Sequence, residues 1–325
     1  MLVPVLLFIV GLVLLIKGGD WFVDGATGIA HRFHVPELLI GATVVSIGTT
    51  LPEVMVSASS AVSGHGEIAY GNAIGSIICN TSLIAALTIA VKPAPVTRKA
   101  LKIPVLFFFT AAVFYSAVAV FSGTFSRLTG AILLLLFLVY MTLTIRQAFR
   151  EKDAPAEPSA PGEGDPVDAP LWKDLVLLVI GAALIAVGAR LLVDNGTIIA
   201  QELGVPESVI GLTIVALGTS LPELVTAITS LAKGHGALSL GNIIGANLFN
   251  LVLVSGISTV LAPFDVPSGK LLAGHNASLV VDTPVMLAVM LIMTVPALLR
   301  GKLYRWQGIL LLCIYAAFCV FQFAL

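Results

Sequence analysis

The chain has 325 residues, of which 58% are hydrophobic and only 11% are charged, and its net charge is −1. An average soluble domain carries about 25% charged residues, so this composition excludes a soluble enzyme and indicates a protein embedded in a lipid bilayer. The near-zero charge and the lack of a Lys/Arg cluster argue against nucleic acid as a partner.

Long apolar runs, separated by charged residues, Pro and Gly, predict ten membrane-spanning helices, because each run can cross about 30 Å of hydrocarbon. Unbroken runs such as 131–141 exclude an outer-membrane barrel, whose strands alternate apolar and polar residues. The predicted spans are 2–31, 36–63, 68–91, 103–122, 126–148, 172–201, 206–232, 237–261, 280–299 and 303–324.

The stretch 151–171 is rich in Pro, Ala, Gly and acidic residues, and it cannot bury enough apolar surface to fold. It predicts a flexible cytoplasmic linker. On either side we expect a five-helix repeat, the first over residues 1–150 and the second over residues 172–325.

The two halves are copies of one another, offset by 170 residues. A motif at 41–83 corresponds to a motif at 211–253. Between Gly41 and Asn80, 17 of the 40 positions are identical to their counterparts, with no gap. This identity is too high for chance.

Each half holds five predicted spans, and an odd number places the second copy upside down in the membrane. With the N-terminus outside, thirteen Lys and Arg residues fall on the cytoplasmic side and two, Arg127 and Lys270, on the external side. The positive-inside rule therefore predicts a multi-pass protein of the cell (inner) membrane with both termini external. The expected fold is an all-α polytopic membrane protein of ten transmembrane helices, arranged as two inverted five-helix repeats.

A Gly-Thr-Thr/Ser-Leu-Pro-Glu segment occurs in both motifs, ending at Glu53 and at Glu223. Pro and Gly weaken a helix, so we expect the second and seventh spans to be interrupted here. An interruption leaves backbone carbonyl oxygens without their helical hydrogen bonds. Hydroxyl side chains also precede each glutamate in the sequence, at Thr49, Thr50, Thr219 and Ser220.

Glu53 and Glu223 are the only acidic residues far from the end of a span. A charge at the bilayer centre costs about 2.5–3.5 kcal/mol on insertion scales, so an interaction must offset it. The inverted repeat brings both carboxylates to the same depth. The alternative is a pair of protonated or hydrogen-bonded acids that only join helices.

The third and eighth spans place amides beside these carboxylates. Ser76 and Asn80 share one helix face, and Asn250 repeats the position of Asn80. Stripes of glycine on both helices predict close approach to the interrupted helices. These glycines are Gly71, Gly75, Gly241 and Gly245.

Carboxylate, hydroxyl, amide and carbonyl oxygens together suit Ca²⁺ and Na⁺, and Cys79 is the only soft ligand atom near this set of oxygens, which therefore does not suit Zn²⁺ or copper. We therefore expect Ca²⁺ and Na⁺ as transported ions, no cofactor and no obligate protein partner. We find no nucleophile and base pair, so the chain is not predicted to be an enzyme. Cys79, Cys313 and Cys319 are expected to be small core residues, and His65 and His235 to lie in solvated turns on opposite faces.

The two motifs resemble the α1 and α2 repeats of the Ca²⁺/cation antiporter superfamily, the sodium/calcium exchanger-like integral membrane proteins, and above all the compact prokaryotic members. The resemblance covers essentially the whole chain. It implies ten helices and ion sites on spans 2, 3, 7 and 8. The ligands that it implies are Thr49, Thr50, Glu53, Ser76, Asn80, Thr219, Ser220, Glu223 and Asn250, with backbone carbonyls near Ser46 and Ala216.

These features predict a secondary active antiporter that exchanges Na⁺ for Ca²⁺ by alternating access at a mid-membrane site with two glutamates, with spans 1 and 6 as sliding elements. Ala246 stands where many relatives carry Ser, which puts the number of sodium ions in doubt. Asn250 stands where potassium-dependent members carry Asp, which argues against K⁺ co-transport. The alternatives are a proton-coupled divalent-cation antiporter and, less favoured by the sequence, a passive cation channel.

Overall fold

The computed structural model describes residues 2–93, 95–152, 170–203, 218–268 and 271–324. The predicted linker therefore lies almost wholly outside the described residues, as does the first half of the predicted seventh span. The last described residues before the linker extend the fifth span as a helix to Lys152, and the next helix begins at Leu171.

The first half of the chain is helical apart from short connections. Its helices are α1 (Leu2–Phe33), α2 (Glu37–Ile40), α3 (Ser46–Val62), α4 (Gly66–Cys79), α5 (Ala86–Val91), α6 (Arg98–Ala117) and α7 (Arg127–Lys152). Three π-helical turns, which widen the helix, join or extend these elements. They are η1 (Gly41–Val45), η2 (Asn80–Ala85) and η3 (Val118–Ser122).

The second half has the same character. Its described helices are α8 (Leu171–Glu202), α11 (Leu221–Ala232), α12 (Gly236–Phe249), α13 (Ser255–Leu261), α14 (Thr283–Arg300) and α15 (Arg305–Ala324), with π turns η5 (Asn250–Val254) and η6 (Ser278–Asp282). Four two-residue strands form two small antiparallel pairs between helices. These pairs are β1 (Thr124–Phe125) with β2 (Phe264–Asp265), and β3 (Leu271–Leu272) with β4 (His275–Asn276).

Within the described residues, nine continuous helical stretches are long and apolar enough to cross a membrane, and α11 is a shorter apolar helix. These ten segments match the ten predicted spans in order. The all-helical membrane fold is thereby confirmed. The helix boundaries also repeat, because α4 and α12 begin and end at positions 170 residues apart.

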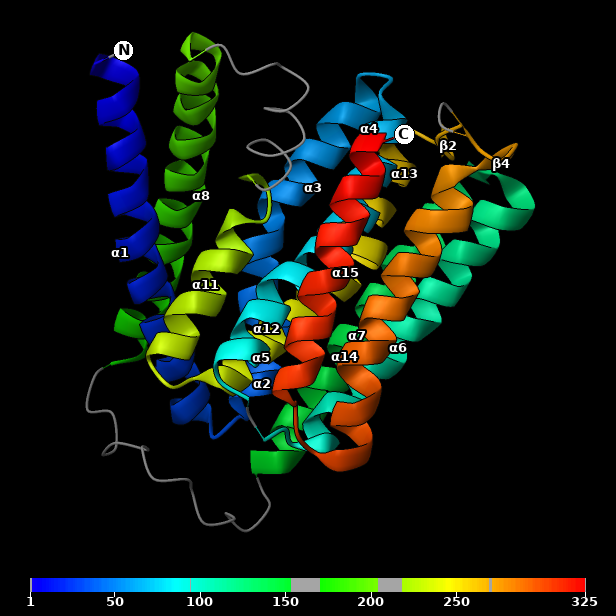
Figure 1. Ribbon diagram of the computed structural model, residues 1–325. Coiled ribbons are helices and arrows are strands. Elements are labelled where there is room, and N and C mark those ends of the chain that lie inside the picture. Colours follow the sequence, from blue (N-terminus) through cyan, green and yellow to red (C-terminus); the bar gives the residue numbers. More distant parts are fainter. Residues whose placement is uncertain (1, 94, 153–169, 204–217, 269–270, 325) are drawn as a thin grey trace.

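Helices α1 and α8 occupy equivalent positions in the two repeats and stand side by side at one edge of the molecule (Figure 1). Their glycines meet backbone to backbone: a Cβ on Gly11 would lie 2.8 Å from the Gly188 carbonyl oxygen, and one on Gly18 would lie 2.9 Å from that of Gly181. Residues later in α1 therefore contact residues earlier in α8. The two helices run antiparallel, as an inverted repeat requires.

Helix α12 lies at the centre of the bundle, and every residue from Leu238 to Phe249 is buried. It packs on α2, η1, α3, α6 and α11. Gly241 and Gly245 allow this contact, because a Cβ at Gly245 would lie 2.7 Å from the Cα of Ala42. This confirms the predicted close approach for these two glycines. A Cβ at Gly71 or Gly75 meets no atom of the described residues within 4 Å.

The predicted interruption is wrong in the first repeat. Helix α3 continues from Ser46 to Val62 with Pro52 inside it. The irregular backbone lies upstream instead, in the π turn η1, where Ser46 Oγ donates to the Gly41 carbonyl and Tyr140 Oη to the Ala42 carbonyl. Neighbouring side chains that satisfy freed carbonyls let a membrane helix tolerate such a defect. In the second repeat α11 begins at Leu221 with Pro222 in its first turn, and residues 204–217, which include the preceding part of this span, lie outside the described residues.

Candidate cation-binding site

The two predicted carboxylates meet in the interior of the bundle. Glu53 lies in α3 and Glu223 in the first turn of α11, and both are 0% exposed. Helices α3 and α11 are in contact. Within the described part of the chain, none of their four carboxylate oxygens has a hydrogen-bond partner.

Neutral oxygens without partners are also found on the predicted ligands. The side-chain oxygens of Thr50, Asn80, Ser220 and Asn250 are fully buried and accept or donate no hydrogen bond among the described residues. Such groups are costly in a protein interior. Hydroxyls without partners also occur elsewhere among the described residues, for example on Tyr115 and Thr259. The cluster at the proposed site differs from these positions because its unpartnered oxygens include two carboxylates.

Both asparagines of the cluster stand at the start of a π turn. Asn80 begins η2 and Asn250 begins η5, directly after α4 and α12. Cys79, directly before Asn80, is buried, and Tyr315 Oη donates to its Sγ at 3.8 Å. The oxygens therefore come from four elements of the two repeats, α3 and α11 with their carboxylates, and the α4–η2 and α12–η5 junctions with their amides.

The remaining predicted ligands have hydrogen-bond partners. Ser46 Oγ donates to the Asn242 carbonyl at 2.9 Å, and Thr49 Oγ1 donates to Asn242 Oδ1 at 3.1 Å. Ser76 Oγ and Thr219 Oγ1 each approach Asn72 Oδ1 at 3.5 Å. Ala216 lies outside the described residues.

Asn72 and Asn242 were not among the predicted site residues. A signal for them was present, because both are identical residues at equivalent positions of the two motifs. The motifs show that the positions correspond, but not that each asparagine contacts a threonine of the other repeat.

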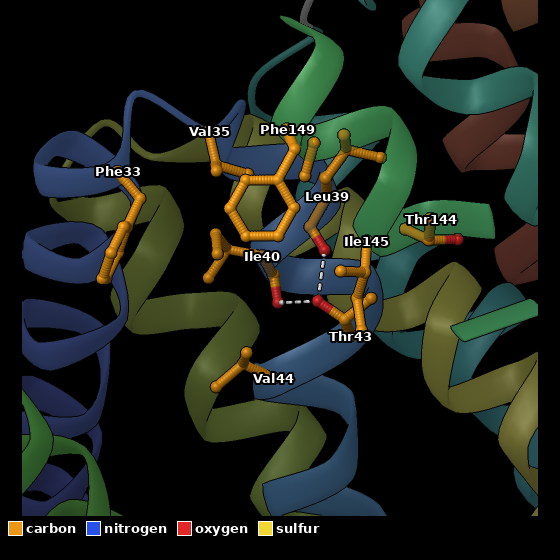
Figure 2. A pocket seen from close by; sticks show the side chains of 10 residues that line it. Phe33, Val35, Leu39, Ile40, Thr43, Val44, Thr144, Ile145 and Phe149 are labelled. Atoms are coloured by element: carbon orange, nitrogen blue, oxygen red, sulfur yellow. Dashed lines mark hydrogen bonds between the residues drawn. The ribbon is translucent and has the colours of Figure 1, made fainter. Parts of the chain in front are cut away.

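Two cavities lie near this region. One of about 920 Å³ runs between α3, α8 and the start of α11 and reaches Pro52, Thr219 and Pro222. The other, of about 200 Å³, lies between α1, α2 and α7 and is lined by apolar side chains such as Val35 and Phe149 (Figure 2). Thr43 at its edge donates to the Leu39 carbonyl at 2.7 Å, so the second cavity offers little to a cation.

One end of the bundle is closed by charged contacts. His235 Nδ1 lies 2.7 Å from Glu37 Oε1, and Lys233 Nζ lies 2.7 Å from Asp24 Oδ1. The expectation that His235 lies in a solvated turn is wrong, because the turn between α11 and α12 packs against the start of α2. Its side chain is 26% exposed.

Comparison with known proteins places this arrangement in a family. Residues 3–146 and 173–324 match the family described as sodium/calcium exchanger protein. The chain is 31% identical to the sodium/calcium exchanger MaX1 of Methanosarcina acetivorans over 98% of both chains, and 37% identical to the inner membrane protein YrbG of Escherichia coli over 82% of both. A solved structure of the sodium-calcium exchanger NCX_Mj, soaked with Na⁺ and Sr²⁺, matches with a TM-score of 0.78 at 34% identity over 97% of both chains. The chain thus belongs to the sodium/calcium exchanger family of membrane antiporters.

Proposed function

We propose that this protein exchanges Na⁺ for Ca²⁺ across the cell membrane, and that both ions bind in turn at Glu53 and Glu223. One observation carries the proposal: two carboxylates on helices that touch, α3 and α11, are buried without a hydrogen-bond partner in the described part of the chain, and so are neutral oxygens on these helices and on the η2 and η5 turns that contact them. The name of MaX1, a sodium/calcium exchanger, supports the choice of ions.

The chemistry of the cluster supports hard cations. Ca²⁺ takes six to eight oxygen ligands in irregular geometry, and two carboxylates balance its charge. The proposed ligand side chains are those of Thr49, Thr50, Glu53, Ser76, Asn80, Thr219, Ser220, Glu223 and Asn250, with carbonyls near Ser46 and Ala216. Na⁺ uses the same kinds of oxygen, so the two ions compete.

Competition becomes exchange if the empty site cannot change sides. Two unpaired carboxylates in a low-dielectric interior are costly, and bound cations remove most of that cost. The loaded site therefore reorients between the two faces faster than the empty one. This asymmetry couples the inward movement of one ion to the outward movement of the other.

The two sides of the site differ in exposure, as alternating access requires. With both termini external, Asn72 and Thr219 lie on the outer side of the glutamates and Thr49 and Asn242 on the cytoplasmic side. The outer pair is half-buried and the cytoplasmic pair is fully buried.

Flux measurements in proteoliposomes test the proposal. Vesicles loaded with Na⁺ should take up ⁴⁵Ca²⁺ when diluted into Na⁺-free buffer. A Na⁺ ionophore should abolish this uptake, and a proton ionophore should leave it unchanged. The reverse pattern would identify a proton-coupled antiporter, and uptake without any counter-ion would identify a channel.

A further inference from the structure

Two hydrogen bonds cross between the repeats in a symmetric pattern. Thr49 Oγ1 of the first repeat donates to Asn242 Oδ1 of the second at 3.1 Å, and Thr219 Oγ1 of the second makes a longer contact, of 3.5 Å, to Asn72 Oδ1 of the first. The two threonines occupy equivalent positions, and so do the two asparagines. Each repeat thus supplies an amide oxygen for the threonine of the other.

This pairing fixes where the hydroxyl hydrogen points. A hydroxyl has one hydrogen to donate and two lone pairs to offer. When the hydrogen points at an amide oxygen, the lone pairs are left for another partner. A threonine that ligates a cation needs this orientation, because a hydrogen that points at the ion would repel it.

The backbone holds Asn242 in place to accept this bond. Gly241 and Gly245 flank it on α12 and let the helix approach α2, η1 and α3 closely. Ser46 Oγ, whose single hydrogen is shared with the Gly41 carbonyl, lies 2.9 Å from the carbonyl oxygen of Asn242. Asn242 and Thr49 are 0% and 1% exposed, so the bond between them is shielded from bulk solvent.

Asn72 is held in a different way. Its Nδ2 donates to Ser57 Oγ at 2.9 Å, which directs its Oδ1 towards Thr219 and Ser76. The counterpart of Ser57 in the second repeat is Ala227, and Asn242 Nδ2 accordingly has no partner among the described residues. The shorter, buried bond at Asn242 relies on the backbone packing instead.

We propose that Asn72 and Asn242 are positioning residues for ion binding, which orient the hydroxyls of Thr219 and Thr49 towards the transported cation. The inference rests on the proposed function and adds two residues to it. Groups that hydrogen-bond a metal ligand typically change metal affinity about 10- to 100-fold when they are replaced. Replacement of either asparagine should therefore weaken Na⁺ or Ca²⁺ binding only while its threonine carries a hydroxyl.

The test combines Asn242→Leu with three residues at position 49. We expect Asn242→Leu to raise the ion concentration for half-maximal transport about tenfold or more in the wild-type and Thr49→Ser proteins. In the Thr49→Val protein, which has no hydroxyl to orient, the same change should have less than about a twofold effect. Asn72→Leu with Thr219→Val and Thr219→Ser repeats the design on the other pair.

Asn247→Leu is the matched control, because this buried asparagine of α12 donates to Thr81 and Met290 instead. Its effect should be equal in all three position-49 proteins. If Asn242→Leu is equally harmful in all three, Asn242 serves packing alone and the inference is overturned, although the proposed function stands. If the folded wild-type protein shows no Na⁺-driven ⁴⁵Ca²⁺ uptake, the proposed function fails and the inference fails with it.

Discussion

Glu53 and Glu223 dominate the electrostatics of the site. A charge at the centre of a bilayer costs about 2.5–3.5 kcal/mol on insertion scales. The described residues place no salt bridge and no hydrogen bond on either carboxylate. The side-chain oxygens of Thr50, Asn80 and Asn250, on α3 and on the turns that contact α3 and α11, are also without partners, and a cation would satisfy both kinds of group at once.

The two repeats differ at one ligand position, and the difference can be tested. Ala246 is fully buried on α12 at the position that Ser76 holds on α4. Ala246→Ser adds a neutral oxygen, so the Na⁺ concentration for half-maximal exchange should fall about fivefold, which corresponds to about 1 kcal/mol. Ser76→Ala should raise it by a similar factor. An unchanged Na⁺ dependence in both variants would place these two positions outside the Na⁺ sites.

At the scale of single residues, the sequence identifies the two carboxylates and the polar residues of the proposed site as candidates, and their role as ion ligands stays a prediction. Their identity in both motifs and their depth in the spans are visible without a structure. The roles of Asn72 and Asn242 were not predictable, because their hydrogen bonds join the two repeats. An internal alignment shows which residues are equivalent, but it does not show which residues touch.

Among the helices, we predict that the contact between α1 and α8 slides during transport. Glycines on both helices bring the backbones together along this contact. Much of the outer surface of both helices is exposed, as for Ile16 and Val187. The pair packs on the remaining helices mainly through α11, which carries Glu223, so a movement of this pair would reach the site.

Gly18→Ala tests whether this movement matters. The added Cβ would lie 2.8 Å from the Ile185 nitrogen, so the two helices must separate, at a cost of about 1–3 kcal/mol. We expect a severalfold slower exchange with an unchanged ion affinity, measured as ⁴⁵Ca²⁺ uptake against ion concentration. Ile16→Ala, at a position that is 54% exposed, is the control. Exchange at the wild-type rate in Gly18→Ala would refute sliding at this contact.

The contact between Glu37 and His235 closes the face that we propose to be cytoplasmic. Ser239 lies one turn beyond His235 on α12 and is 2% exposed. In a protein without native cysteines, Ser239→Cys should react slowly with a small polar thiol reagent. Adding Glu37→Ala should speed the reaction severalfold, because it removes the contact of Glu37 with His235 that we propose to hold this face closed. Equal rates with and without Glu37→Ala would show that the contact does not hold this face shut.

The interrupted helix shows where local sequence rules fail. Gly48 and Pro52 predict a break, yet α3 runs through both residues, and the backbone deviates in η1 instead. Proline removes one donor, and a membrane helix can tolerate this loss when tertiary contacts hold the rest of the helix. Tyr140, about a hundred residues away in sequence, supplies one such contact, and no local pattern reveals it.

For the whole molecule, the orientation in the membrane is a prediction that charge alone supports. Thirteen positive residues on one side against two on the other place both termini outside. Alkaline phosphatase fused to the C-terminus should therefore be active, and green fluorescent protein fused there should be dark. The opposite result would show that the protein has the reverse orientation in the membrane, with the Glu37–His235 contact on the external side.

Most of the architecture was predictable, since long apolar runs and a repeat of five spans determine both the helices and their inversion. The antiparallel contact of α1 with α8 follows the same logic. The closed end was not predictable, because the contacts of Lys233 and His235 join a turn of the second repeat to helices of the first. Expecting a solvated turn ignored this packing.

The central claim is that Glu53 and Glu223 together bind the exchanged ions. Na⁺-gradient-driven ⁴⁵Ca²⁺ uptake by Glu53→Gln and Glu223→Gln proteins in proteoliposomes tests it most directly, because glutamine keeps the size of the side chain and removes its charge. We predict that each substitution reduces uptake at least about 100-fold, while the purified proteins remain folded. Uptake at the wild-type rate by either folded variant would contradict the claim.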